Sequence, residues 1–425
     1  MNKKELFKFL INEFHAASTA QINHRDLIVP KLNKTVTLIG PRRAGKTFYF
    51  YQLIKDLTEQ GIPKDRIVYL DFEDDRILPL KSTDLNSLIE AYFELYPENK
   101  QKEIYLFFDE IQNISGWELF VRRISDKEKV KVFVTGSSSK LLSKEIATAL
   151  RGRTLTFYLF PLSFKEFLRF KGIELKKNFE YTSLRFNIKK LFEEYLYWGG
   201  FPEVVLEKPE LKQKILSDYF ELIIHKDLAD RFAIRNITLM KNLSKFLITN
   251  LASIFSISAY HKAVSQDRPT AKKTIIEYLS NLEDVNFVYF ISLFDYSFKK
   301  QQANPKKVFC IDNGFRNAVA FVFSKDEGKL AENMAFIELK RSEKEIYYWK
   351  NKNEVDFVIK NKDNSLEAIN VTYTNEVPER EIRGLLEFKE KFRKTKKLII
   401  LTKDLEKKEN GINFMPLWKW LLQGK

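Results

Sequence analysis

Short apolar runs alternate with longer stretches of helical periodicity between residues 35 and 160. The runs are Thr35–Gly40, Arg66–Asp71, Glu103–Asp109, Lys131–Thr135 and Thr154–Phe160. Strands that alternate with helices predict a parallel sheet covered by helices, which is an α/β fold. Upstream of the first run, Leu6, Phe9, Leu10 and Phe14 recur at helical spacing and predict an N-terminal helix.

The pattern changes after Phe160 and stays helical to about residue 285, with breaks at residues 199–202 and at Pro209. Two helices then precede two apolar runs, Phe287–Phe294 and Val308–Ile311, which a basic segment joins. This order predicts a winged helix whose two-stranded ribbon has a basic tip.

The last hundred residues alternate again. The expected strands are Phe336–Leu339, Ile346–Trp349, Asp356–Ile359, Ala368–Thr372 and Leu398–Thr402, with a helix near residues 379–393. This pattern predicts a small α/β domain at the C-terminal end of the chain.

Composition narrows the class of protein. The chain has 425 residues, enough for two to four domains, and Lys and Arg exceed Asp and Glu by 15 charges. The excess is spread over both halves, so a solvated surface and a polyanionic partner both remain open. Cys310 is the single cysteine, which excludes an intrachain disulfide or a cysteine-based zinc site. No apolar stretch approaches the roughly 18 residues of a membrane span, and we expect a soluble, cytoplasmic protein without membrane contact.

The strongest chemical signal is a glycine-rich segment between the first expected strand and a helical run over residues 48–57. Its sequence, G-P-R-R-A-G-K-T-F, comprises Gly40, Pro41, Arg42, Arg43, Ala44, Gly45, Lys46, Thr47 and Phe48. Such a loop wraps backbone N–H groups around phosphates. Lys46 then reaches the β and γ phosphates, and the Thr47 hydroxyl is left to coordinate Mg²⁺. We expect all nine residues to contribute to nucleotide binding.

A second signal is the apolar run 104–108, which ends in Asp109 and Glu110. Asp109 at the end of such a strand can hold Mg²⁺, and Glu110 can deprotonate an attacking water. The second acid favours hydrolysis of ATP, in which water accepts the phosphoryl group, over transfer of that group to another substrate. A further strand candidate, Arg66–Asp71, lies between the two motifs, and the chain has no guanine-reading Asn-Lys-x-Asp motif. We therefore expect the nucleotide to be ATP.

Two further candidates follow the strand that ends near Thr135. Ser137 can contact the γ-phosphate or the lytic water as a polar sensor. Arg151 and Arg153 can neutralise transition-state charge when supplied across a subunit interface, which predicts a homo-oligomer. An ordinary turn and surface arginines are the alternatives.

With these motifs, the chain resembles the bacterial and archaeal ATPases that fuse an AAA+-like phosphate-loop domain to a C-terminal domain of unknown function. The matching segments are GPRRAGKT at 40–47, LFFDEIQ at 106–112, TGSSSKLLS at 135–143, LRGRT at 150–154, FPLSFKEF at 160–167, YWGGFPEVV at 197–205, ENMAFIEL at 332–339 and NEVDFVI at 353–359. The resemblance implies an ATPase core with its N-terminal helix over 1–165, a helical lid over 166–245, a winged helix over 246–324 and a domain similar to PD-(D/E)xK nucleases over 325–425.

The nuclease-like domain departs from the active pattern. Active relatives use an Asp on one strand and an Asp/Glu-x-Lys on the next to hold a metal and polarise water. Asp356 matches the first position and Glu332 can supply a helical acid, but Asn370 and Thr372 stand where the second acid and the lysine belong. Glu367 points to the opposite strand face. We therefore expect a catalytically degenerate domain.

DNA is the expected polyanionic partner. A candidate recognition helix spans residues 269–282, and its basic residues together with those of the wing are Lys272, Lys273, Lys299, Lys300, Lys306 and Lys307. Basic side chains on a helix and wing suit phosphate contacts, although a winged helix can also serve packing or partner binding.

The sequence thus favours an Mg²⁺-dependent ATPase that couples turnover to DNA or to a DNA-bound partner. A nucleotide-dependent signalling switch with a protein-binding C-terminal half is the second hypothesis. An ATP-regulated nuclease is the third.

Overall fold

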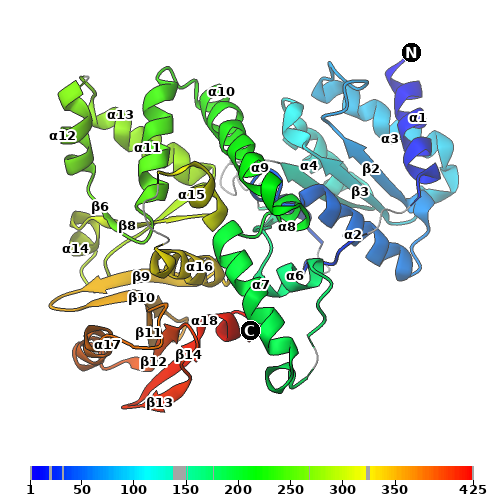
Figure 1. Ribbon diagram of the computed structural model, residues 1–425. Coiled ribbons are helices and arrows are strands. Elements are labelled where there is room, and N and C mark those ends of the chain that lie inside the picture. Colours follow the sequence, from blue (N-terminus) through cyan, green and yellow to red (C-terminus); the bar gives the residue numbers. More distant parts are fainter. Residues whose placement is uncertain are drawn as a thin grey trace. The chain divides into compact units, whose positions relative to one another are not determined.

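The computed structural model of the protein describes residues 2–18, 22–30, 33–136, 150, 152–175, 177–267, 269–321 and 326–423. The chain divides into two compact units, Met1–Leu159 and Phe160–Lys425, whose elements are labelled in Figure 1. Within the described ranges, no helix combines the length and the apolar character needed to cross a membrane.

The first unit is built on a five-stranded sheet in which every pairing is parallel, with the order β2-β3-β4-β1-β5. The strands are β1 (Thr35–Ile39), β2 (Ile67–Asp71), β3 (Ile104–Asp109), β4 (Val130–Gly136) and β5 (Thr154–Tyr158). All five strands predicted from the apolar runs are confirmed. The helices are α1 (Lys3–Ala16), α2 (Lys46–Glu59), α3 (Asn86–Leu95) and α4 (Trp117–Lys127).

Alternation along β3 explains why helices pack on both faces of this sheet. Leu106 and Phe108 belong to one buried cluster, which also contains apolar residues of α1, α3 and α4. Phe107 belongs to the other cluster, with Phe50 and Ile54 of α2. Successive strand residues point to opposite faces, so a nearly continuous apolar strand requires cover on both sides.

Helix α1 forms as expected, and packing decides which of its residues are buried. Leu6, Phe7, Leu10 and Ile11 are buried, whereas Phe9 is 51% exposed. Both residue sets have helical spacing, and only packing against the first unit's core distinguishes them.

The second unit begins with a run of helices. They are α6 (Phe164–Phe170), α7 (Leu184–Trp198), α8 (Pro202–Leu206), α9 (Pro209–Leu222), the π-helical segment Ile223–Ala229, α10 (Asp230–Phe232), α11 (Ile237–Thr249), α12 (Ile257–Asp267) and α13 (Lys272–Asp284). Pro202 and Pro209 occupy the first turns of α8 and α9. A backbone N–H at this position has no acceptor within the helix, so proline, which lacks the N–H, is well tolerated there. The predicted breaks in the helical pattern are thus confirmed as helix starts.

A small antiparallel sheet follows, with the order β6-β8-β7. Its strands are β6 (Ile254–Phe255), β7 (Val288–Ile291) and β8 (Lys306–Cys310). The expected basic tip between the last two strands is not a simple turn, because helix α14 (Phe298–Ala303) occupies it. Helix α15 (Asn313–Val319) continues the chain after β8.

The C-terminal part contains a six-stranded mixed sheet with the order β13-β14-β12-β11-β10-β9. Its strands are β9 (Glu345–Lys350), β10 (Glu354–Lys360), β11 (Leu366–Val371), β12 (Thr395–Thr402), β13 (Lys407–Glu409) and β14 (Ile412–Pro416). Three helices accompany the sheet, α16 (Glu327–Arg341), α17 (Glu379–Lys391) and α18 (Leu417–Trp420).

The prediction of a strand at Phe336–Leu339 is wrong, because these residues lie in helix α16. Residues on every side of this helix are buried, from Leu330 to Leu339. A helix enclosed by other elements has no polar stripe, so its apolar run imitates that of a buried strand.

Candidate functional site

The glycine-rich loop joins β1 to α2, as its sequence predicts. At Gly40 a β-carbon would lie 2.3 Å from the carbonyl oxygen of Leu159. This separation is too short for any residue with a side chain. Gly45 has a φ of 92°, and Arg43 reaches the left-handed region with a φ of 66°. The loop therefore takes a tight path that glycine at two positions makes possible.

Lys46 is held inside this loop and is 5% exposed. Its ammonium group donates to the carbonyl oxygens of Gly40 at 3.2 Å and Pro41 at 3.1 Å. These acceptors are neutral, so a phosphate oxygen in the loop would be the stronger partner for the ammonium. The geometry suits an anion at this position.

Asp109 stands at the centre of the polar contacts beside the loop. The Thr47 hydroxyl donates to Asp109 Oδ2 at 2.6 Å, and the Tyr69 hydroxyl donates to the same oxygen at 3.1 Å. Thr135 donates to Asp109 Oδ1. Thr47 and Asp109, the two residues predicted as metal ligands, are thus already in contact although 62 residues separate them.

Glu110 follows Asp109 with a left-handed backbone, at a φ of 50°. Its N–H donates to the Thr135 hydroxyl at 3.1 Å, and its carboxylate accepts from the Gln112 side chain. A non-glycine residue in this region costs about 1–3 kcal/mol and persists only where its surroundings impose it. The turn directs Glu110 away from the course of β3.

Several carboxylates lie close to one another where strands β2 and β3 end. Burial raises the pKa of Asp71, and Asp109 and Glu110 raise it further. Burial also raises the pKa of Glu73, with Glu110 adding to the effect and Arg42, 3.8 Å away, opposing it. A cation bound near these acids would lower the pKa values of both groups.

Mg²⁺ fits these residues when nucleotide oxygens complete its coordination. As the side chains lie in the part of the chain that the structure describes, no group of three or more His, Cys, Asp or Glu is arranged to hold a metal by itself. Mg²⁺ in phosphate-loop sites instead uses one or two protein oxygens together with phosphates and water. Thr47 and Asp109 provide such a pair.

Thr135 offers a test of how this site is supported. Thr135→Val removes the hydroxyl that contacts Asp109 and accepts from the Glu110 N–H, while it preserves shape. We expect ATP turnover to fall about 10–100-fold, the usual effect of losing a partner that orients a metal ligand. Thr135→Ser keeps the hydroxyl and should retain most activity. Equal turnover by the Val and Ser variants would contradict the role of the hydroxyl.

Sequence reasoning missed three residues of this site. Tyr69 and Thr135 contact Asp109 because their strands flank β3 in the sheet. Arg25, which is 4% exposed, donates to the Ala44 carbonyl at 2.8 Å and so supports the loop. A signal existed for Thr135, a polar residue at the end of an apolar strand, but none marked Arg25.

The sensor and arginine predictions have different outcomes. Ser137 and Arg151 lie outside the described residues. Arg153 precedes β5, at the opposite end of the strands from the glycine-rich loop, and its side chain pairs with Asp126 at 2.7 Å. Arg153 therefore lies away from the glycine-rich loop of its own chain.

Five of the six candidate lysines for DNA contact are exposed: Lys272, Lys273, Lys299, Lys300 and Lys306. The prediction for Lys307 is wrong. Its side chain is 2% exposed and pairs with Glu332, Glu354 and Asp356. Neighbouring residues of a strand point to opposite faces, so Lys306 reaches solvent while Lys307 enters the interior.

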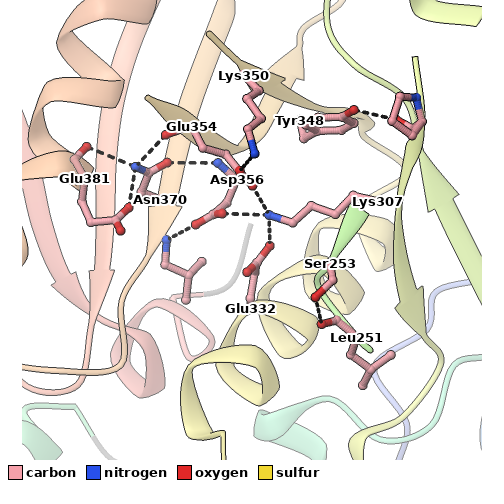
Figure 2. A network of polar contacts seen from close by, with 12 residues as sticks. Leu251, Ser253, Lys307, Glu332, Tyr348, Lys350, Glu354, Asp356, Asn370 and Glu381 are labelled. Carbon is pink, nitrogen blue, oxygen red and sulfur yellow. Dashed lines mark hydrogen bonds and ion pairs between the residues drawn. The ribbon is translucent and has the colours of Figure 1, made fainter. Parts of the chain in front are cut away.

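Two of the residues predicted for the terminal domain, Asp356 and Asn370, meet in space. Asp356 lies beside Asn370, whose side-chain oxygen accepts from the Asp356 N–H at 3.0 Å. The Asn370 amide donates to Glu381 Oε2 at 2.9 Å (Figure 2). Glu367 instead accepts from Asn361 and Lys397. Asn370 on β11 thus forms side-chain hydrogen bonds to both strand β10 and helix α17.

Family comparisons divide the chain into three segments. Residues 32–168 match the AAA domain family, and residues 189–326 and 327–420 match two families described as domains of unknown function, DUF8612 and DUF4143. An uncharacterized protein of Methanocaldococcus jannaschii is 34% identical over 99% of this chain and 96% of its own length. An uncharacterized protein of Haemophilus influenzae is 33% identical over 90% of this chain and 93% of its own.

Similarities to solved structures are more distant. The Walker-type ATPase PABY2304 of Pyrococcus abyssi is 13% identical, covers 67% of this chain and 90% of its own, and has a TM-score of 0.42. The ORC1 protein of Aeropyrum pernix, solved in complex with DNA, is 11% identical, covers 78% of this chain and 91% of its own, and has a TM-score of 0.30.

Proposed function

The chain belongs to the family of its relatives in M. jannaschii and H. influenzae, and residues 32–168 form its AAA domain; on this premise, we propose that it is an Mg²⁺-dependent ATP hydrolase. The observation that carries the proposal is the contact between Thr47 and Asp109, 2.6 Å long, beside the buried ammonium of Lys46. A phosphate-binding cation and two oxygen ligands for a metal thus converge at one end of the sheet.

Each residue then has a defined part in hydrolysis. Lys46 exchanges its contacts with the loop carbonyls for oxygens of the β and γ phosphates. Glu110 accepts a proton from the attacking water, and its left-handed backbone and its contact with Gln112 fix its direction. Thr47 and Asp109 hold Mg²⁺, which when bound neutralises charge on the phosphates.

A homo-oligomer is part of the proposal. Arg153 cannot reach its own loop, so its contribution to hydrolysis requires a second subunit whose site it approaches, with the pair to Asp126 exchanged for phosphate contacts. Sedimentation of the protein with and without ATP tests this point, and a chain that stays monomeric under turnover conditions would exclude it.

We further propose that ATP turnover is coupled to DNA. Two observations support this, the net charge of +15 and the exposed pair Lys272 and Lys273 at the start of α13. Helix α13 follows α12 and precedes the antiparallel strands β7 and β8, an order that favours a winged helix with α13 as the recognition helix.

ATP turnover measured with single-stranded, duplex and branched DNA tests the coupling. We expect stimulation by at least one form, with an affinity that falls as salt rises. Lys272→Ala combined with Lys273→Ala should reduce the slope of log K against log salt by about 2, because each lysine removed takes away roughly one phosphate interaction. Lys396→Ala combined with Lys397→Ala, an equal charge change on β12, should leave the slope unchanged.

DNA that neither binds nor changes turnover would favour the second candidate, a nucleotide-dependent switch whose C-terminal half binds a protein. The observation that supports this alternative is the apolar side chains on the helical part of the second unit, among them Phe186, which is 75% exposed, and Tyr181, which is 89% exposed.

A further inference from the structure

Lys307 reaches from β8 into a group of three carboxylates. Its ammonium nitrogen lies 2.5 Å from Glu332 Oε1, 2.9 Å from Glu354 Oε1 and 2.9 Å from Asp356 Oδ1. Figure 2 shows these side chains converging on the nitrogen from helix α16 and strand β10. The lysine lies in the segment that matches DUF8612, whereas all three acids lie in the DUF4143 segment. The contact therefore joins two family-defined segments.

The ammonium donates hydrogen bonds to Glu354 Oε1 and Asp356 Oδ1, and it forms an ion pair with Glu332 Oε1. It has three N–H donors, and three carboxylate oxygens lie within 2.9 Å of it. The distances to Glu354 and Asp356 suit charge-assisted hydrogen bonds, whereas oxygen ligands would lie at about 2.0–2.2 Å from a small divalent cation. The Lys307 side chain is 2% exposed, and its nitrogen lies between the acids, in the space that such a cation would need.

Electrostatics supports a permanently charged lysine. Burial alone would lower the pKa of Lys307, but Asp356, Glu332 and Glu354 outweigh it and raise the pKa well above its usual value. Burial raises the pKa of Glu332, and Asp356 adds to this. Lys350 contacts Glu354 at 3.3 Å and contributes a second positive charge. The centre thus approaches charge balance with side chains alone.

We propose that Lys307 is an internal cation that takes the place of a divalent metal in this carboxylate centre and thereby closes the centre to metal ions. The same contact locks β8 to the C-terminal sheet. A lysine that acted on a substrate phosphate would instead need room for that phosphate beside its ammonium, and here three carboxylates surround the buried side chain.

Mn²⁺ binding by the full chain tests the proposal without disturbing the lysine. Free Mn²⁺ is followed by electron paramagnetic resonance in the absence of nucleotide, for the wild type and for Asp356→Asn. Any Mn²⁺ at the glycine-rich loop is common to both proteins, so their difference reports the centre alone. We expect equal stoichiometry. One additional Mn²⁺ in the wild type would overturn the proposal, as would Mn²⁺-dependent DNA cleavage that Asp356→Asn abolishes.

Removal of the lysine should open the centre. Lys307→Met leaves buried acids without their cation, and we expect the melting temperature to fall by about 5–10 °C. Mn²⁺ should restore part of this loss in Lys307→Met and none of it in Lys307→Met combined with Asp356→Asn. Lys306→Met, an exposed neighbour on the same strand, is the matched control and should melt as the wild type does.

Two outcomes of the lysine variant contradict the proposal. One is a Lys307→Met protein that melts at the wild-type temperature. The other is a destabilised variant whose melting temperature Mn²⁺ leaves unchanged, because an internal cation must be replaceable by an added one. If Lys307→Met does not fold, the comparison of Mn²⁺ stoichiometry between the wild type and Asp356→Asn still tests whether the centre is closed to metal ions.

Discussion

Lys46→Ala is expected to abolish ATP turnover. The ammonium of Lys46 is buried inside the loop and donates to the carbonyls of Gly40 and Pro41, so its charge is directed at the space that the loop encloses. Loss of one charge-stabilising donor at a transition state typically costs about 10²–10³-fold in rate. Lys46 also contributes to ground-state binding, so we expect kcat/KM to fall by at least this factor.

The measurement is steady-state ATP hydrolysis together with equilibrium binding of a labelled ATP analogue. Lys55→Ala is the matched control, because Lys55 lies on the same helix and its side chain is 48% exposed. It should keep wild-type kinetics. Circular dichroism must show that both variants are folded. Near-normal hydrolysis by folded Lys46→Ala would refute the assignment of the nucleotide site.

Glu110→Gln should separate binding from chemistry. An amide keeps the shape of the carboxylate but cannot take a proton from water, and loss of a general base typically costs about 10²–10⁴-fold. We therefore expect kcat to fall by that factor while ATP affinity stays within about threefold of wild type. Asp109→Ala, by contrast, should weaken binding of Mg²⁺ and nucleotide, since Asp109 contacts Thr47 directly.

Single-turnover hydrolysis and nucleotide binding at several Mg²⁺ concentrations distinguish the two acids. Glu98→Gln, an exposed change of the same type on the first unit, should have no effect on either measurement. If Glu110→Gln hydrolyses ATP at the wild-type rate, water activation belongs to another residue. If Asp109→Ala binds Mg²⁺ and nucleotide normally, Asp109 is not a ligand.

The first unit was predictable because its signals are local. An apolar run that ends in two acids is visible within a few residues of sequence, and β3 begins and ends within one residue of its predicted bounds. The glycine-rich loop likewise needs only its own residues and the strand and helix beside it. Local sequence also gave the breaks at Pro202 and Pro209, because proline restricts its own backbone.

Prediction failed where burial on all sides removed the periodic signal. Helix α16 was predicted as a strand at Phe336–Leu339 because no polar face interrupts its apolar residues. On α1 the helix was predicted correctly, but helical spacing alone does not indicate that Phe7 is buried and Phe9 exposed. In both cases the neighbouring elements decide which residues are buried. The local sequence pattern carries no information about these neighbours.

The sequence by itself determined which residues carry the chemistry of the nucleotide site, since Lys46, Thr47, Asp109 and Glu110 are recognisable from spacing and residue type. Only the tertiary structure decided what surrounds them. It inserts β4 between β1 and β3, which brings Thr135 to Asp109. It also turned Lys307 inward to Asp356, 49 residues away, and left its neighbour Lys306 in solvent. Strand order and pairing arise from contacts between distant segments, and such contacts leave no periodic trace in the sequence.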